Sequence, residues 1–260
     1  MWVYDRAEKR KFCTNVANIA HETKLYSNDL ESKLATEIEA PANEVLDKIR
    51  SRQSIDRNDK TVLAKYLIAL WKRVPKAKER IKGAMPRVAG EIGERIYREI
   101  DRLTSERPDL RELGEKRKAE VSAILKRHLE APPDFVFHHG VDPDKAPHVL
   151  DTITAMIWRF WITGTGTSYL TSDNPVFFFE SEGVGKPSSE LCFPISSDIM
   201  LWATWRTDLL EGYLPARGAL VKEFNRRTVQ NSKRFVFAQT DERWILPFVL
   251  KTSLRLNRIR

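Results

Sequence analysis

Cysteines, long apolar runs and a secretory start are scarce or missing in this sequence of 260 residues. The two cysteines, Cys13 and Cys192, lie far apart and form no CxxC pair, which argues against a disulfide framework or a structural zinc site. Since no run of about 18 apolar residues is present, we expect no membrane-spanning helix. The first residues contain no apolar segment after basic ones, so we expect no secretory signal. These absences predict a cytoplasmic protein with no membrane partner.

Several catalytic motifs are also missing. No GxSxG hydrolase elbow and no HExxH metal motif occurs, and the segment Gly164–Gly166 lacks the remaining Gly and Lys of a P-loop. A restriction-type nuclease core would need Glu-x-Lys after its Asp. Asp173 precedes Glu180 and Glu182, but residue 184 is Val. The sequence therefore identifies no reaction by motif alone.

The charge is unevenly distributed along the chain. Residues 1–130 hold 29 Lys and Arg against 22 Asp and Glu, whereas residues 131–260 hold 15 against 14. A basic excess favours association with polyanions such as nucleic acid. The alternative is an ordinary solvated helical surface, and composition does not separate the two.

Apolar residues in the first half recur at helical spacing. One wide stripe, whose members run from Val62 to Trp71, ends before Pro75. Further helices are predicted over residues 91–103, from about residue 105 to His128, and from Pro147 through Ile157. A break or kink is expected near Ala40, because Pro41 follows it.

In the second half the period changes to two. The predicted strands cover residues 168–170, 176–179, 191–193, 200–205, 219–222, 234–238 and 245–250. A helical N-terminal part followed by a mainly antiparallel β-sheet places the chain in the α+β class. We expect a basic helical part over residues 1–130 and a strand-rich part over residues 131–260, joined as one integrated domain.

A rigid polar turn lies between two of the predicted strands. Ser172, Asp173 and Asn174 precede Pro175, and short polar side chains of this kind bond nearby backbone while Pro fixes the turn. The turn is either a structural device or one wall of a functional site.

The order of six segments of the sequence resembles a bacterial family of unknown function catalogued as DUF4238. The polar turn is the closest match, and the other segments lie at the start of the chain, at two predicted helix ends and in two later predicted strands. The matching segments are Trp2–Asp5, Ile38–Pro41, Trp71–Pro75, Leu170–Val176, Phe193–Ser196 and, with Asn225 before it, Arg234–Ala238.

This resemblance implies a fold and a set of retained residues more than a chemistry, because the family has no established activity. Members of the family usually open with a His-Tyr-Val-Pro segment that is missing from this sequence. If that His belongs to an active site, this chain lacks it.

The polar residues within the matching segments form the first candidate site. Glu39 and Asp173 are a carboxylate pair of the kind that holds Mg²⁺, and Arg73 has the fork geometry that clamps a phosphate. Asn174 completes the candidate catalytic set, with Ser172 and Asn225 as further site residues. In the alternative interpretation, each of these side chains only fixes its own turn or helix end.

Two other clusters are candidates. A basic stretch for nucleic-acid binding is formed by Lys72, Lys76, Lys78, Arg80, Lys82 and Arg87, although a solvated helical face explains it equally well. A group of His138, His139, Asp142, Asp144 and His148 has metal-binding residue types. It lies in a connector rich in Pro and Asp without metal-site spacing, which favours a solvated loop.

The sequence therefore favours a nucleic-acid-directed protein, with a metal-dependent nuclease or a toxin-like effector in bacterial defence as its specific forms. The alternative is a non-catalytic module that binds a partner protein through an aromatic-rich surface. Its candidate contacts are Trp158, Trp161, Trp202, Trp205 and Trp244, unless these belong to the core.

Overall fold

A computed structural model describes residues 1–15, 19, 28–130, 143–164, 166–179, 183–251 and 255–259. Within helices, it leaves undescribed the side chains of residues 28–30, 75, 76, 78, 80 and 81. The chain divides into two compact units. We call Met1–Pro75 with Val141–Arg260 the body, and Lys76–Gly140 the hairpin.

The first sheet of the body joins the two ends of the sequence. Its strand order is β2 (Arg10–Cys13), β1 (Trp2–Asp5), β9 (Phe235–Ala238) and β4 (Thr171–Ser172), and every pairing is antiparallel. Trp2 is opposite Ala238, and Thr171 is opposite Phe237. The expected strand at residues 234–238 is thus confirmed, and it shares a sheet with the first two strands of the chain.

The second sheet has five strands. Their order is β5 (Phe177–Phe178), β6 (Glu190–Pro194), β7 (Ile199–Thr204), β3 (Ile157–Ile162) and β8 (Gly212–Pro215), with all pairs antiparallel except β3 and β8. Helices in the N-terminal half and mainly antiparallel strands in the rest confirm the α+β class.

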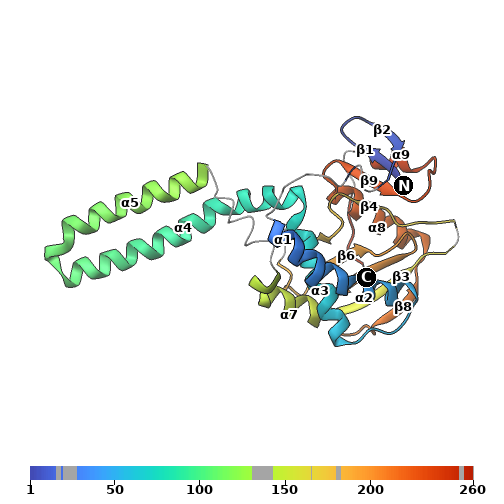
Figure 1. Cartoon of the computed structure of the whole chain (residues 1–260), viewed down its shortest axis with the longest axis horizontal. Helices are drawn as coiled ribbons and strands as arrows, with labels where there is room; N and C mark the ends of the chain where they lie inside the picture. Colours follow the sequence, from blue (N-terminus) through green and yellow to red (C-terminus); the bar gives the residue numbers. More distant parts are fainter. Residues whose placement is uncertain are drawn as a thin grey trace. The chain divides into compact units, whose positions relative to one another are not determined.

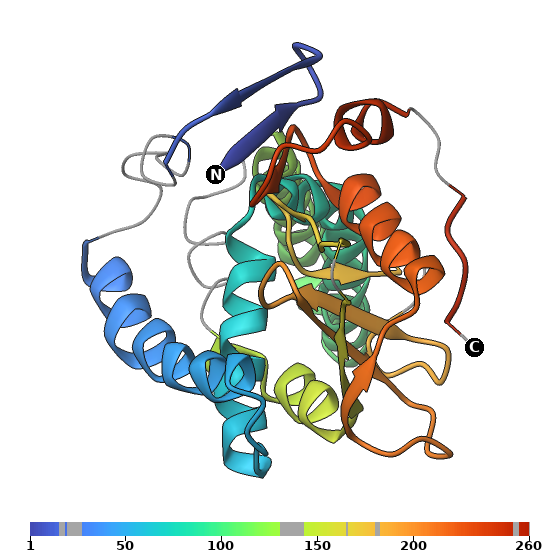
Figure 2. The same ribbon diagram turned by 90° about the vertical axis from the view of Figure 1, so that its right-hand side faces the viewer.

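Successive side chains along the strands of this sheet pack into two different hydrophobic clusters. Leu191 and Phe193 of β6 pack in one cluster with α2 (Ala40–Arg50), α3 (Arg57–Arg73) and α7 (Pro147–Ala155). Cys192, between them, packs in another cluster with α8 (Gly218–Asn231). Since successive side chains of a strand point to opposite faces, the sheet is covered on both sides. Figure 2 shows α8 on one side of these strands and α2 and α3 on the other.

The helix α3 is set by local sequence signals. Asp56 precedes it and accepts from the Asp59 amide at 2.8 Å, while the Asp59 side chain accepts from the Asp56 amide at 3.2 Å. This reciprocal capping box satisfies free amides at the helix start. The helix ends before Pro75, as predicted. Near Ala40, where a break or kink is expected, the backbone stays helical: the π-helix η2 (Leu34–Glu39) passes directly into α2, and the short helix α1 (Asn28–Lys33) precedes η2.

The hairpin consists of two long helices, α4 (Pro75–Glu106) and α5 (Arg111–Glu130), joined by η3 (Pro108–Leu110). Figure 1 shows the two helices side by side and antiparallel. Two glycines allow a close approach between them. A Cβ at Gly114 would lie 2.5 Å from Thr104 Cγ2, and one at Gly93 would lie 3.0 Å from Leu125 Cδ1. The predicted helix over residues 91–103 is thus part of a longer helix, which continues through Pro86.

Four secondary-structure predictions are wrong. Residues 168–170 were expected to be a strand but form none, and β4 begins only at Thr171. Residues 219–222 and 245–250 were expected to be strands but lie in the helices α8 and α9 (Ile245–Val249), and Ile157 begins β3 instead of ending the helix α7. These short apolar runs fit either period, and packing decides between them. The remaining short element is η4 (Pro143–Lys145). Among the described helices, none is long and apolar enough to cross a membrane.

Candidate functional site

The polar turn after β4 is fastened to the segment between α8 and β9. Asp173 accepts three backbone hydrogen bonds, from Lys233 at 2.8 Å, Arg234 at 2.7 Å and Phe235 at 2.9 Å. Successive backbone amides of this kind form a concave anion site, which the Asp173 carboxylate occupies. This bonding explains the turn as a structural device, and a catalytic role for Asp173 stays a prediction.

Two asparagines of α8 form hydrogen bonds with the backbone of the polar turn and of the residues on either side of it. Asn231 donates to the carbonyls of Asn174 at 2.7 Å and Val176 at 2.9 Å, and Asn174 donates back to the Asn231 carbonyl at 3.0 Å. Asn225 accepts from the Leu170 amide at 2.9 Å and donates to the Ser168 carbonyl at 2.9 Å. The Ser172 hydroxyl accepts from the Asn174 amide at 3.2 Å. The structure therefore brings Ser172, Asp173, Asn174 and Asn225 together in one region where the polar turn contacts α8 and the residues after it.

Glu39 and Arg73 meet each other elsewhere in the body. Arg73 donates to Glu39 in an ion pair between η2 and α3, with Glu31 at 3.9 Å as a second partner. Among the described residues, no hydrogen bond or ion pair joins this pair to Asp173. Within the same residues, no group of three or more His, Cys, Asp or Glu is arranged to hold a metal ion. The Mg²⁺ site of Glu39 and Asp173 thus stays a prediction.

The structure describes only some side chains of the basic stretch, and these do not form one continuous basic surface. Arg87 pairs with Glu91 at 2.9 Å, and Lys82 is exposed. Lys72 lies in the last turn of α3, and the side chains of Lys76, Lys78 and Arg80 lie outside the description. Of the histidine group, His138, His139 and Asp142 are outside the described residues, while Asp144 pairs with Lys65 at 2.8 Å and His148 is exposed on α7.

The tryptophans do not form a common surface. Trp158 and Trp202 are each 1% exposed and belong to the core clusters, so the prediction that they present an aromatic surface is wrong. Trp161 and Trp205 are partly buried against the same clusters. Only Trp244 of the five is exposed, at 39%.

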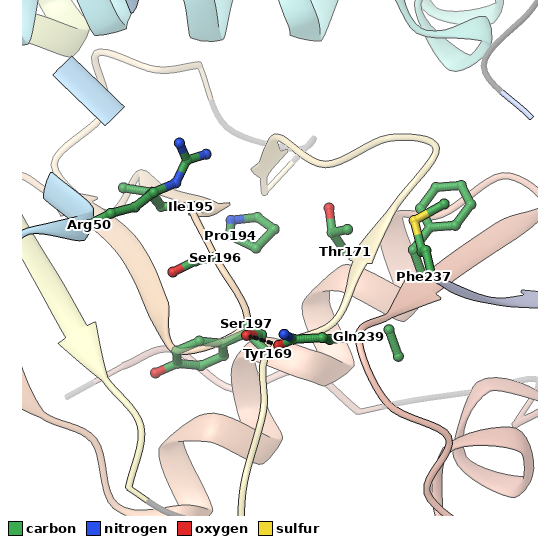
Figure 3. A pocket seen from close by; sticks show the side chains of 11 residues that line it. Arg50, Tyr169, Thr171, Pro194, Ile195, Ser196, Ser197, Phe237 and Gln239 are labelled. Carbon is green, nitrogen blue, oxygen red and sulfur yellow. Dashed lines mark hydrogen bonds between the residues drawn. The ribbon is translucent and has the colours of Figure 1, made fainter. Parts of the chain in front are cut away.

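A cavity of about 480 Å³ lies where the first sheet meets the β6–β7 turn. We call it the motif cavity, because Thr171, Pro194–Ser196 and Phe237 come from three of the segments that carry the family resemblance. Figure 3 shows Arg50 on one side of Pro194, and Thr171 with Phe237 on the other. Its lining consists of Met1, Arg50, Tyr169, Thr171, Pro194, Ile195, Ser196, Ser197, Phe237, Ala238 and Gln239.

The motif cavity has polar groups with spare donors. Ser197 donates to Gln239 Oε1 at 2.5 Å, while the Gln239 amide nitrogen donates to none of the residues that the structure describes. Ser196 donates to Asp198 at 2.6 Å. Arg50 is the only charged side chain in the lining, and its partner Asp47, at 2.8 Å, lies on the exposed surface of α2. These groups suit the binding of a polar ligand with negative charge.

A second cavity, of about 450 Å³, lies beside α8 and α9. We call it the aromatic–lysine cavity, after Trp244, Lys222 and Lys251. Both lysines are exposed and form no ion pair with the residues that the structure describes, and the lining contains no carboxylate. The remaining members of the lining are Gly166, Thr167, Ser168, Gly218, Val221, Asn225, Pro247 and Phe248.

A buried ionic cluster lies under the C-terminal residues. Arg227 is fully buried and donates to Glu190 at 2.8 Å and to the Asn257 carbonyl at 2.6 Å, and Glu223 lies 3.7 Å away. Burial raises the pKa of the neighbouring Cys192 thiol to about 12. Because the thiolate is the reactive form, this cysteine is no nucleophile at neutral pH. The cluster has the character of a core interaction.

The comparison with family models decides the classification. The model for a protein of unknown function, DUF4238, matches residues 1–242. The chain belongs to this family. No curated protein and no solved structure matches it.

The two cavities differ in whether all of their lining residues lie within the segment that matches DUF4238. Every residue that lines the motif cavity lies within residues 1–242, whereas Trp244, Phe248 and Lys251 of the aromatic–lysine cavity lie beyond them. The sequence pointed to Trp244 as a candidate contact residue and to part of the motif cavity through the matching segments. It missed Arg50, Lys222 and Lys251, because no local pattern distinguishes them from other surface cations.

Proposed function

We propose that this DUF4238 protein binds single-stranded nucleic acid at the aromatic–lysine cavity. The observation that supports this proposal is the exposed ring of Trp244 beside two lysines that form no ion pair within the described part of the chain. Aromatic rings stack bases without regard to sequence, and lysines attract the phosphates between them. The net charge of +8 adds a general attraction for polyanions.

The absence of a carboxylate from the lining is important for this choice. The lining that the structure describes contains no acidic residue that would neutralise Lys222 or Lys251, and Glu242, which accepts a hydrogen bond from the Trp244 indole nitrogen, lies outside the lining. A single strand is favoured over a duplex, because the base must leave its stack to lie on Trp244.

The sequence also predicted a metal-dependent nuclease or a toxin-like effector in defence. Among the residues that the structure describes, no group of three or more His, Cys, Asp or Glu is arranged to hold a metal ion. The proposal therefore stops at binding, and nuclease activity stays a prediction for Asp173, Asn174, Glu39 and Arg73.

The test is the affinity for a labelled single-stranded oligonucleotide, measured by fluorescence anisotropy at several salt concentrations. Replacement of both Lys222 and Lys251 by Ala should make the slope of log K against log salt less negative by about 1.4, or about 0.7 for each lost phosphate contact. Trp244→Ala should weaken binding by about 1–3 kcal/mol.

The control is Lys116→Ala with Lys126→Ala, which removes the same charge from exposed positions of α5. It should leave the slope near that of the unchanged protein. Equal effects of the two double variants would reduce the binding to a general charge effect, and no binding at about 50 mM salt would overturn the proposal.

A further inference from the structure

The motif cavity is independent of the proposed nucleic-acid site. Its walls come from α2, from the segment before β4, from the β6–β7 turn and from the end of β9. These parts are far apart in sequence, so the fold itself creates the cavity. Its volume of about 480 Å³ falls within the range of about 300–1,000 Å³ that is usual for small-molecule sites.

The charge of the lining indicates the charge of the ligand. Arg50 supplies the positive charge, and none of the lining residues is acidic. Its pair with Asp47 joins two exposed side chains, 47% and 72% accessible, at neighbouring positions on one helix. A pair of this kind contributes little and exchanges readily, so the guanidinium is available to an incoming oxyanion.

Neutral donors lie across the cavity from Arg50. Gln239 uses its amide oxygen to accept from Ser197, which leaves its nitrogen to donate. The Thr171 hydroxyl makes no hydrogen bond with the described part of the chain, and this side chain faces the same cavity. The nearest carboxylate on the β6–β7 turn, Asp198, accepts from Ser196 and is outside the lining.

Much of the remaining lining is apolar, beside the hydroxyls of Tyr169, Ser196 and Ser197. Pro194, Ile195, Phe237 and Ala238 offer carbon surface between the polar groups. A small inorganic ion would leave this surface uncovered. A ligand with an anionic head and a compact apolar or aromatic body would cover both kinds of surface.

We propose that the motif cavity binds a small organic anion. Arg50 holds its oxyanion, Gln239 and Thr171 donate to its polar groups, and Phe237 with Pro194 packs against its body. Carboxylate and phosphate share the chemistry that Arg50 recognises, since both accept two parallel hydrogen bonds from a guanidinium.

The experiment is calorimetric titration of the full chain with phenyl phosphate, with benzoate and with the uncharged benzamide, each up to about 10 mM, which detects weak sites. At least one anion should bind and benzamide should not. Preference for phenyl phosphate or for benzoate identifies the phosphate or the carboxylate as the natural head group. Binding of benzamide as tight as that of the anions, or of none of the three, would overturn the proposal.

Variants locate the site. Arg50→Ala should weaken binding of the preferred anion at least about tenfold, and Arg50→Lys should restore part of it, because a lysine is a single point charge. Gln239→Ala should have a smaller effect. Arg57→Ala, an exposed arginine at the start of α3 outside the lining, is the matched control and should leave binding unchanged.

This test is separate from that of nucleic-acid binding. The double alanine variant of Lys222 and Lys251 should bind the small anion as the unchanged protein does. Equal losses in Arg50→Ala and Arg57→Ala would overturn the assignment to the motif cavity. Thermal melting of each variant confirms that it is folded.

Discussion

The body and the hairpin bury their apolar residues to very different extents. All described core clusters lie in the body, where both faces of the five-stranded sheet are covered. Of the large apolar side chains that are exposed, only Leu210 and Trp244 belong to the body. The others belong to the hairpin and are Val88, Ile92, Leu103, Leu113, Ile124 and Leu129. Two helices alone have no third element under which to bury an apolar face.

The ion pairs of the two regions differ in the same way. In the hairpin most join neighbouring helical positions, as Arg102 does with Glu99 and Glu106. In the body several join distant parts of the chain, as Arg234 does with Asp5 and Arg227 with Glu190. Local exposed pairs contribute little, whereas a buried pair is costly to break. The stability of the body therefore depends on contacts between residues that are far apart in the sequence.

The largest effect is expected at the buried ionic cluster. Arg227→Ala should lower the free energy of unfolding by about 3–5 kcal/mol, because it leaves the buried Glu190 without its close ion pair and removes one of the two arginines beside Glu223. Urea denaturation measures this change. Arg226→Ala, at the next position of α8, removes a half-buried arginine that also pairs with Glu223 and should remain close to the unchanged protein. Similar losses in both variants would contradict the importance of burial.

A direct comparison of the two regions uses one substitution in each. Leu67→Ala in α3 removes a fully buried side chain and should cost about 2–5 kcal/mol. Leu113→Ala in α5 removes a side chain that is 49% exposed and should change stability by less than about 0.5 kcal/mol. The free energies of unfolding from urea denaturation decide the matter. A large loss in Leu113→Ala would show that this face of the hairpin is covered in solution.

Asp173 tests whether its turn is structural or catalytic. Asp173→Ala leaves three backbone amides without their acceptor and should cost about 2 kcal/mol, and Asp173→Asn should cost less because it keeps an acceptor oxygen. Thermal and urea denaturation measure both variants. Unfolding of Asp173→Ala at the same midpoint as the unchanged protein would contradict the structural role and favour the catalytic prediction.

The smallest effect is expected from acid. Hydrogen bonds from Arg234 hold the pKa of Asp5 below its ordinary value of 3.8. This contribution to stability is present above about pH 4 and is lost as the pH falls through the lowered pKa. Arg234→Ala should therefore move the midpoint of acid unfolding to higher pH. The matched change in the hairpin, Arg102→Ala, removes the fully exposed partner that lowers the pKa of Glu99 and should move it much less. An equal shift in both would contradict the comparison.

Much of the fold was predictable from the sequence, because long periodic segments carry their own signal. The stripe from Val62 to Trp71 marked α3, and the alternation in residues 234–238 marked β9. Short apolar runs such as Ile245–Val249 were assigned wrongly, since five residues satisfy either period. Local sequence cannot decide them, but burial against β1 and β9 can.

The candidate sites were predictable only in part, for a related reason. The polar turn was marked by its residue types, and Trp244 by its chemistry. Arg50 becomes distinctive only when the fold places it at the motif cavity with segments more than a hundred residues away. Lys222 and Lys251 acquire their meaning from the absence of an acidic neighbour in the lining, which composition does not reveal.

The position of β1 between β2 and β9 has a consequence for synthesis of the chain. Trp2 cannot meet its partner Ala238 until that residue has emerged from the ribosome. Meanwhile one edge of the β1–β2 ribbon is open to other strands, and chaperones that shield nascent chains are the natural protection for it.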